Sequence, residues 1–147
     1  GVVLHLMKQK GLSIDEVQQI LYRKSGLLGV SGISNNMQVL QQNSDPKAKE
    51  AIELFCYRAV REIGALVAVL GGIDALVFTA GIGENSELVR RLICEPLAWL
   101  GIELDNDANV AGKNKINSKQ SDIDVHIIPT NEEAMIAIST SELIQQK

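Results

Sequence analysis

The sequence predicts an α/β domain in which parallel strands are flanked by helices. Two apolar runs, residues 75–80 and 123–128, are bounded by turn residues, a pattern typical of strands buried on both faces of a parallel sheet. A helical pattern lies between them, and the order strand, helix, strand favours a right-handed parallel crossover. Before the first run, apolar residues at spacings of three and four predict a long helix across a domain face.

The first helix is predicted to begin at Ser13, because Ser13 and Glu16 have the spacing of a capping box. Gly26 is expected to end this helix. Residues 27–36 are rich in Gly, Ser and Asn, so we expect an irregular connection there.

The long helix is predicted to begin at Asp45-Pro46, since proline is tolerated at the first helical position, and to end at Gly71-Gly72. At about 25 residues it is longer than most globular helices. Its apolar stripe consists of Ile52, Phe55, Cys56, Ala59, Ile63, Leu66, Val67 and Leu70.

The first strand, Ala75–Ala80, is expected to turn through residues 81–86 into a helix around Glu87–Ile93, with Asn85 or Ser86 as N-cap and Pro96 as its stop. Residues 101–121 are polar, and we expect a loop with at most a short strand near 102–104. After the second strand, Thr130 and Glu133 predict a capping box for a last helix.

Two parallel strands alone would leave both sheet edges unpaired. We therefore expect the sheet to be completed by an upstream segment or by a second copy. The chain starts at Gly1 without an initiator methionine, which fits a piece of something longer.

Composition excludes several classes of function. The 147 residues carry 14 Lys+Arg against 18 Asp+Glu, so there is no basic surface for nucleic acid. The apolar stretch at 63–83 is interrupted by Gly71-Gly72 and by Asp74, which argues against a membrane span. No signal peptide is visible, and Cys56 and Cys94 are expected to be buried, reduced thiols, so we expect a cytoplasmic protein.

The segment Gly81-Ile82-Gly83-Glu84-Asn85-Ser86 is a candidate ligand site. Ligands bind open α/β sheets at the carboxyl ends of the strands, where glycines let the backbone approach a ligand and a helix N-terminus offers N–H groups. The segment matches neither the G-x-G-x-x-G pattern nor the P-loop. The alternative is a tight strand-to-helix turn without a ligand.

A second candidate, Pro129-Thr130-Asn131-Glu132-Glu133, follows the second strand. Glu132 has no capping duty and could hold Mg²⁺, which uses one or two protein carboxylates beside water and phosphate oxygens. The alternative is an acid favoured by the helix dipole. His126, within a strand, is expected to be a packed or hydrogen-bonded side chain and not a catalyst.

Together these residues resemble the acetate kinase family. Residues 78–86, Phe-Thr-Ala-Gly-Ile-Gly-Glu-Asn-Ser, resemble its nucleotide-loop signature, and residues 128–133, Ile-Pro-Thr-Asn-Glu-Glu, its C-terminal metal-site motif. Residues 24–32, Lys-Ser-Gly-Leu-Leu-Gly-Val-Ser-Gly, match a further recurrent stretch. No single one of these motifs is specific for the family. The three motifs occur in order and cover nearly the whole chain, and this combination is specific.

The resemblance implies a ribonuclease H-like domain of the actin-like ATPase superfamily, truncated, with residues 1–147 as most of the C-terminal nucleotide-binding domain. It implies that Gly81, Ile82, Gly83, Glu84 and Asn85 hold ATP or ADP and that Glu132 positions Mg²⁺. A further nucleotide segment falls on Asn36, Met37 and Gln38. Here Asn36 replaces an acid and Gln38 an arginine, so the affinity or base preference is expected to change.

The resemblance also places the phosphate-binding loop, two arginines and a catalytic histidine upstream of Gly1. We therefore expect no catalytic residue in this chain and no turnover by it alone. The intact enzyme would make acetyl phosphate and ADP from acetate and ATP, or act on propionate. The alternative is a non-catalytic nucleotide-binding or dimerisation module, since this half is expected to form a homodimer.

Overall fold

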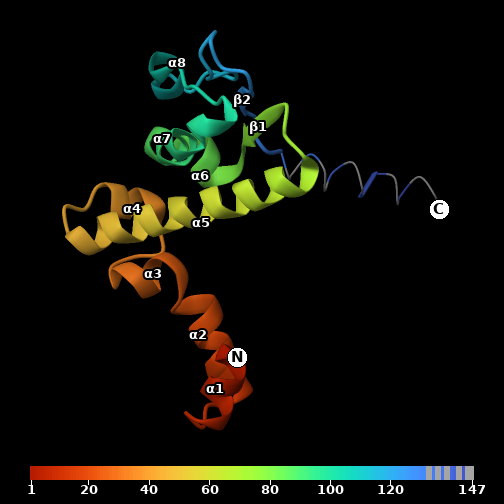
Figure 1. Ribbon diagram of the computed structural model, residues 1–147. Helices are drawn as coiled ribbons and strands as arrows, with labels where there is room; N and C mark the ends of the chain where they lie inside the picture. Colours follow the sequence, from red (N-terminus) through yellow and green to blue (C-terminus); the bar gives the residue numbers. More distant parts are fainter. Residues whose placement is uncertain (132–133, 135–136, 138–139, 142–143, 145–147) are drawn as a thin grey trace. The chain divides into compact units, whose positions relative to one another are not determined.

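The computed structural model describes residues 1–131, 134, 137, 140–141 and 144, and it has the predicted α/β class with a parallel strand pair and flanking helices (Figure 1). The chain divides into two compact units, Gly1–Ala59 and Val60–Lys147, each of which is considered by itself. In the described part of the chain, no helix combines the length and apolar character needed to cross a bilayer.

The first unit is helical. Its elements are α1 (Val2–Lys8), α2 (Ile14–Arg23), α3 (Gly26–Ser31), α4 (Met37–Gln41) and the start of α5 (Pro46–Leu70). The predicted capping box is confirmed: the Ser13 N–H donates to the Glu16 carboxylate at 2.8 Å, and the Glu16 N–H donates to Ser13 Oγ at 3.3 Å. Reciprocal capping therefore begins α2 where the sequence indicates.

Three helices of this unit were not predicted. The expectation of an irregular connection at 27–36 is wrong in part, because α3 occupies residues 26–31 and ends at Gly32 with φ of 65°. A Cβ on Gly29 of this helix would lie 2.8 Å from the Lys24 carbonyl oxygen, so the turn requires glycine. α2 ends at Arg23 and not at Gly26. α1 is rich in apolar residues but buries none of them.

The long helix α5 has the predicted bounds, Pro46–Leu70, and is followed by Gly71 with φ of 77°. Asp45 Oδ1 accepts the Lys47 N–H at 2.8 Å, which satisfies a free amide of the first turn. The predicted stripe is buried at Ile52, Cys56 and Val67, but Leu66 and Leu70 are 60% and 70% exposed. The end of α5 therefore exposes apolar side chains that the predicted stripe would bury.

The second unit contains the sheet. Strands β1 (Ala75–Phe78) and β2 (Asp124–Ile127) pair in parallel with Ala75 opposite Asp124 and Phe78 opposite Ile127, which confirms the predicted parallel pairing. Both strands are shorter than predicted. The expectation of burial on both faces is wrong for β1, where Val77 is 46% exposed, whereas β2 buries alternate residues.

The outer edge of β2 is also paired, which corrects the expectation that both edges of the pair are bare. The Ile116 N–H donates to the Val125 carbonyl and the Ile127 N–H to the Asn114 carbonyl, each at 2.9 Å. Asn117 in turn forms an antiparallel bridge with Leu104. The expected loop at 101–121 therefore adds irregular strand segments to the sheet, and it carries the short helix α8 (Asn106–Val110).

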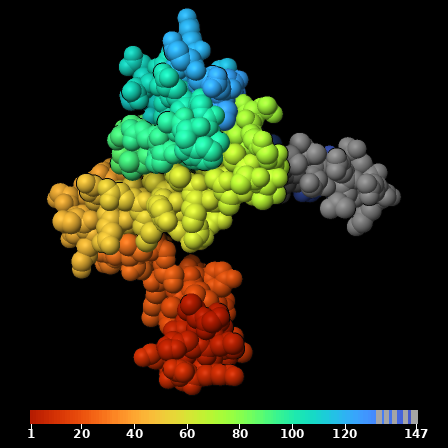
Figure 2. All heavy atoms as spheres, in the orientation of Figure 1, coloured from red at the N-terminus to blue at the C-terminus, as the bar shows by residue number. Residues whose placement is uncertain are grey.

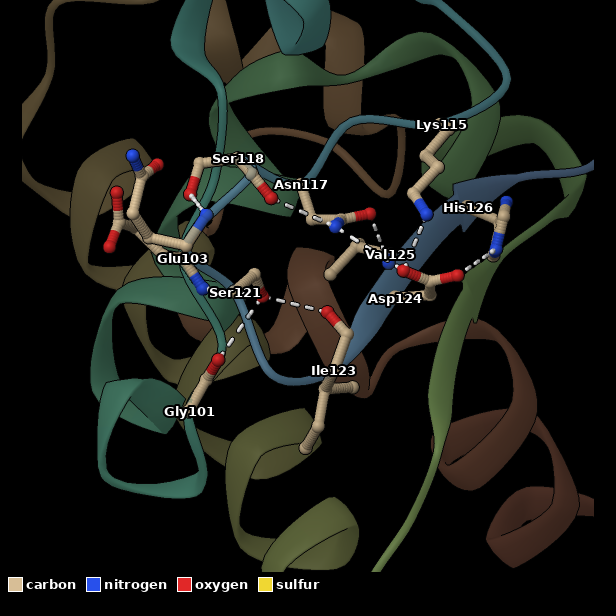
Figure 3. A network of polar contacts seen from close by, with 11 residues as sticks. Gly101, Glu103, Lys115, Asn117, Ser118, Ser121, Ile123, Asp124, Val125 and His126 are labelled. Carbon is tan, nitrogen blue, oxygen red and sulfur yellow. Dashed lines mark hydrogen bonds and ion pairs between the residues drawn. The ribbon is translucent and has the colours of Figure 1, made fainter.

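Side chains fix this segment to β2 (Figure 3). Asn117 Oδ1 accepts the Val125 N–H at 2.9 Å, and Ser121 Oγ donates to the Ile123 carbonyl at 2.7 Å. Asp124 lies between Lys115, at 2.6 Å, and the half-buried His126, at 3.6 Å. The expected role of His126 as a polar-contact residue of the strand fits this arrangement.

Between the strands lie α6 (Ala80–Asn85), α7 (Glu87–Cys94) and the 3₁₀ helix η1 (Glu95–Leu100). Ser86 caps α7 by accepting the Val89 N–H at 3.1 Å, as one of the two predicted caps. α7 ends at Cys94, two residues before Pro96, as predicted, and the chain continues as η1, whose first turn accepts the proline. Figure 2 shows the atoms of α7, η1 and α8 as one continuous mass.

The two cysteines are free and buried. Burial raises the pKa of the Cys56 thiol to about 11 and that of the Cys94 thiol to about 12. Both side chains therefore behave as small apolar groups, as predicted from composition.

Candidate functional site

The predicted nucleotide segment forms a short helix at the carboxyl end of β1. Gly81, Ile82, Gly83, Glu84 and Asn85 all lie on α6, where the sequence analysis expects a turn. The helix begins at Ala80, which has a left-handed φ of 59°. Such a backbone costs a non-glycine residue about 1–2 kcal/mol, so the reversal from strand to helix is imposed by its surroundings.

The two glycines of α6 have different environments. A Cβ on Gly83 would lie 3.3 Å from the Phe78 carbonyl carbon, so the helix packs directly on the end of β1. A Cβ on Gly81 would meet nothing within 4 Å. The backbone is therefore open to an approaching ligand at Gly81 and closed by the fold at Gly83.

Asn85 is exposed at the end of α6, and its Nδ2 donates to the Gly81 carbonyl at 2.8 Å. This hydrogen bond gives the Gly81 carbonyl a donor from the same helix and holds the Asn85 side chain beside Gly81. Asn85 is therefore both an internal brace of the segment and an accessible amide at its surface.

Arg90 is the functional candidate that the sequence analysis missed. It lies on α7, is 2% exposed, and its Nη1 donates to the Gly83 carbonyl at 2.8 Å and the Glu84 carbonyl at 2.9 Å. Its Nε donates to Asn109 Oδ1 at 2.7 Å, and its Nη2 to the Asn109 carbonyl at 2.8 Å. The available signal was its position: Arg90 lies on the buried face of α7 beside Val89, Ile93 and Cys94.

The two predicted motifs meet at Glu84. The backbone N–H of Thr130 donates to Glu84 Oε1 at 2.9 Å, and the Thr130 hydroxyl donates to the same oxygen at 3.1 Å. Thr130 follows β2 and Glu84 follows β1, so the link joins the carboxyl ends of neighbouring parallel strands. Asn131 Oδ1 accepts the Ala134 N–H at 3.0 Å. The predicted last helix falls largely outside the described residues.

This link lowers the pKa of the Glu84 carboxyl below its ordinary range, first through the Thr130 backbone N–H and further through the Thr130 hydroxyl. Since the pKa is lower in the folded state, the stabilisation by Glu84 is present above its unfolded value, about 4.3. It is lost as the pH falls through the folded value.

We expect the amide proton of Thr130 to report this titration in NMR spectra, with a midpoint below about pH 4.3. In Thr130→Ala the midpoint moves only part of the way upward, because the backbone donor remains. A midpoint at or above the ordinary glutamate value in the parent chain would contradict the link.

The other predicted nucleotide residues lie in the first unit. Asn36 caps α4 by accepting the Gln38 N–H at 2.8 Å, a role that asparagine fills as well as aspartate. Met37 is 4% exposed and belongs to the core, and Gln38 is exposed. Asn36 and Met37 therefore have structural roles, while the exposed side chains of Asn36 and Gln38 remain accessible.

The predicted metal ligand, Glu132, lies outside the described residues, as does Glu133 of the expected capping box. Among the residues that the structure describes, no three metal-ligating side chains gather. Glu84, at this edge of the sheet, already accepts two hydrogen bonds from Thr130.

The fold and this site define an α/β domain in which the motifs that follow its two parallel strands meet at one edge of the sheet through Glu84 and Thr130. Residues 1–138 match the model of the acetokinase family, and the chain belongs to that family.

Named relatives agree with this assignment. The chain is 53% identical over 139 residues to an acetate kinase of Rhodopseudomonas palustris, which covers 93% of this chain and 35% of that protein. It is 47% identical over 137 residues to an acetate kinase of Rickettsia prowazekii, covering 93% and 36%. The chain thus spans about a third of the length of these relatives.

Solved structures show the same fold. A Porphyromonas gingivalis acetate kinase matches with a TM-score of 0.86 and 34% identity, over 98% of this chain and 38% of that one. A Francisella tularensis propionate kinase matches with a TM-score of 0.84 and 38% identity, over 92% of this chain and 36% of that one.

Proposed function

We propose that this chain is most of the C-terminal, nucleotide-binding domain of an ATP-dependent carboxylate kinase, which transfers a phosphoryl group from ATP to acetate. The intact enzyme would yield acetyl phosphate and ADP. The link between Glu84 and Thr130 carries the proposal, because it brings the two family-like motifs together at one sheet edge.

Each part of the motif has a role in binding. The open backbone at Gly81 and the accessible amide of Asn85 would contact ATP or ADP, with Ile82, Gly83 and Glu84 forming the rest of the segment. The family resemblance also assigns nucleotide contacts to Asn36, Met37 and Gln38. The family resemblance assigns Mg²⁺ to Glu132, where the ion would neutralise phosphate charge.

Phosphoryl transfer depends on positioning and on charge stabilisation. The resemblance assigns these roles to a phosphate loop, two arginines and a histidine, which we expect to lie outside this chain. We therefore expect no turnover above buffer when the chain is assayed with ATP, Mg²⁺ and acetate in a coupled ADP assay. Measurable turnover would show that the chain carries its own catalytic groups.

Nucleotide binding separates the proposal from a purely structural module. We expect Mg-ADP to bind the chain in calorimetric titrations and Asn85→Ala to weaken binding severalfold. Asn106→Ala, at another exposed asparagine, in α8, is the matched control and should not change the affinity. Glu132→Ala should act mainly on the Mg²⁺ dependence. An unchanged affinity in Asn85→Ala would favour a turn without a ligand.

A propionate kinase is the second candidate, because one of the structural relatives bears that name. Groups that distinguish acetate from propionate are expected outside this chain, so the choice requires substrate profiles of the intact enzyme. We further propose a cytoplasmic homodimer that assembles through this half. The exposed apolar residues of α5, among them Tyr57 and Val69 at 62% and 83% exposure, fit such an interface.

A further inference from the structure

A buried cation lies behind the proposed nucleotide segment. Arg90 is 2% exposed, and the hydrogen bonds of its guanidinium go to carbonyl and amide oxygens of α6 and Asn109. A charge buried in this way is costly unless its donors are all used. The burial of Arg90 therefore indicates that the oxygens around it depend on its guanidinium for their hydrogen bonds.

Those partners include the carbonyls at the end of α6. The last carbonyls of a helix have no intrahelical donor, and a helix of six residues is too short to be stable alone. Arg90 Nη1 supplies donors to Gly83 and Glu84, and its positive charge complements the negative end of the helix. The position of α6 is thus set from α7.

The guanidinium is itself held from the other side. Asn109, 1% exposed on α8, accepts from Nε and Nη2, and its own Nδ2 donates to the Glu87 carbonyl at 3.1 Å. A planar fork can serve α6 and Asn109 at once, which an ammonium group cannot. Arg90 therefore connects its own helix α7 to both α6 and α8.

We propose that Arg90 is a positioning residue for the nucleotide site, an inference that rests on the proposed function. Arg90 fixes the backbone of α6, and α6 places the Glu84 carboxylate where it holds Thr130. Through this chain of contacts, Arg90 and Asn109 set the distance between the two motifs without touching the ligand.

The test uses Arg90→Lys in the 147-residue chain, with Arg91→Lys as the matched control because Arg91 pairs with Glu95 near the surface at 3.0 Å. At a temperature where both are folded, Arg90→Lys should raise the Kd for Mg-ADP about tenfold or more, since misplacement of binding groups is costly. Amide hydrogen exchange should speed up at residues 81–85 and stay unchanged in β1 and β2.

Asn109 gives a second pair of variants. Asn109→Asp keeps an acceptor for Arg90 Nε and should leave the Kd within about twofold, whereas Asn109→Leu removes it and should raise the Kd in the same direction as Arg90→Lys. If Asn109 had only a structural role, the variants would have lower thermal stability, but their Kd values for Mg-ADP would not differ from each other. This pair decides the matter if Arg90→Lys does not fold.

Unchanged affinity and unchanged exchange at residues 81–85 in a folded Arg90→Lys chain would overturn the inference. If the parent chain does not bind Mg-ADP, the proposed function fails while the exchange data still decide whether Arg90 positions α6. The two failures are therefore distinguishable.

Discussion

Arg90→Met is expected to lower the free energy of unfolding by about 3 kcal/mol. The change removes the donors of the Gly83, Glu84 and Asn109 carbonyls and of Asn109 Oδ1. Each buried acceptor left without a donor costs about 1–3 kcal/mol, and these costs are partly offset because the guanidinium no longer has to be desolvated. Methionine fills most of the volume, so the loss is mainly one of hydrogen bonds.

Arg91→Met is the control for this prediction. Arg91 precedes Glu95 by four residues and their side chains form a surface ion pair at 3.0 Å, which contributes about 0.5 kcal/mol or less. Urea unfolding followed by circular dichroism measures both variants against the parent. Should Arg90→Met unfold at the same denaturant concentration as Arg91→Met, the network around Arg90 would not support the fold as we describe.

The elements that the sequence predicts well are those with a local signal. The capping box at Ser13 and Glu16, the bounds of α5 at Pro46 and Gly71, and the two apolar runs that become β1 and β2 each follow from a few neighbouring residues. The parallel pairing also follows, because chain chirality leaves few connections for a strand, helix, strand order.

The elements that the sequence misses depend on contacts between distant residues. The sequence predicts a turn at residues 81–86, whereas the structure has the helix α6 there. It is helical because Arg90, seven residues beyond Gly83, supplies donors to its free carbonyls. The strand-like segment at 114–117 likewise forms through bonds to β2 that no local pattern reports.

The candidate site shows the same division. Residues 81–85 and 129–133 are predicted from their position after predicted strands, and the structure brings Glu84 and Thr130 into contact. Arg90 and Asn109 are 19 residues apart in the sequence, and nothing local indicates their bond. The sequence indicates such a contact only by an arginine that stands among the apolar residues of a helix.

Substitutions at the two glycines of α6 are expected to change different properties, stability at Gly83 and nucleotide affinity at Gly81. In Gly83→Val the Cβ would lie 3.3 Å from the Phe78 backbone, and the added methyl groups would push α6 away from the end of β1. We expect a loss of about 2 kcal/mol, as for other overpacked sites. Hydrogen bonds from Arg90 to the carbonyls of α6 would be strained by the same displacement.

Gly81→Ala is the matched variant in the same short helix. Its Cβ meets no atom within 4 Å and its φ is not left-handed, so the fold should be unchanged or up to about 1 kcal/mol more stable through helix propensity. Its Kd for Mg-ADP should nevertheless rise, because the methyl group occupies the space through which a ligand reaches the backbone. Thermal unfolding and calorimetry on both variants make the comparison. If Gly81→Ala destabilised the chain while Gly83→Val did not, α6 would pack on β1 through the other glycine, and the open side of the site would be wrongly assigned.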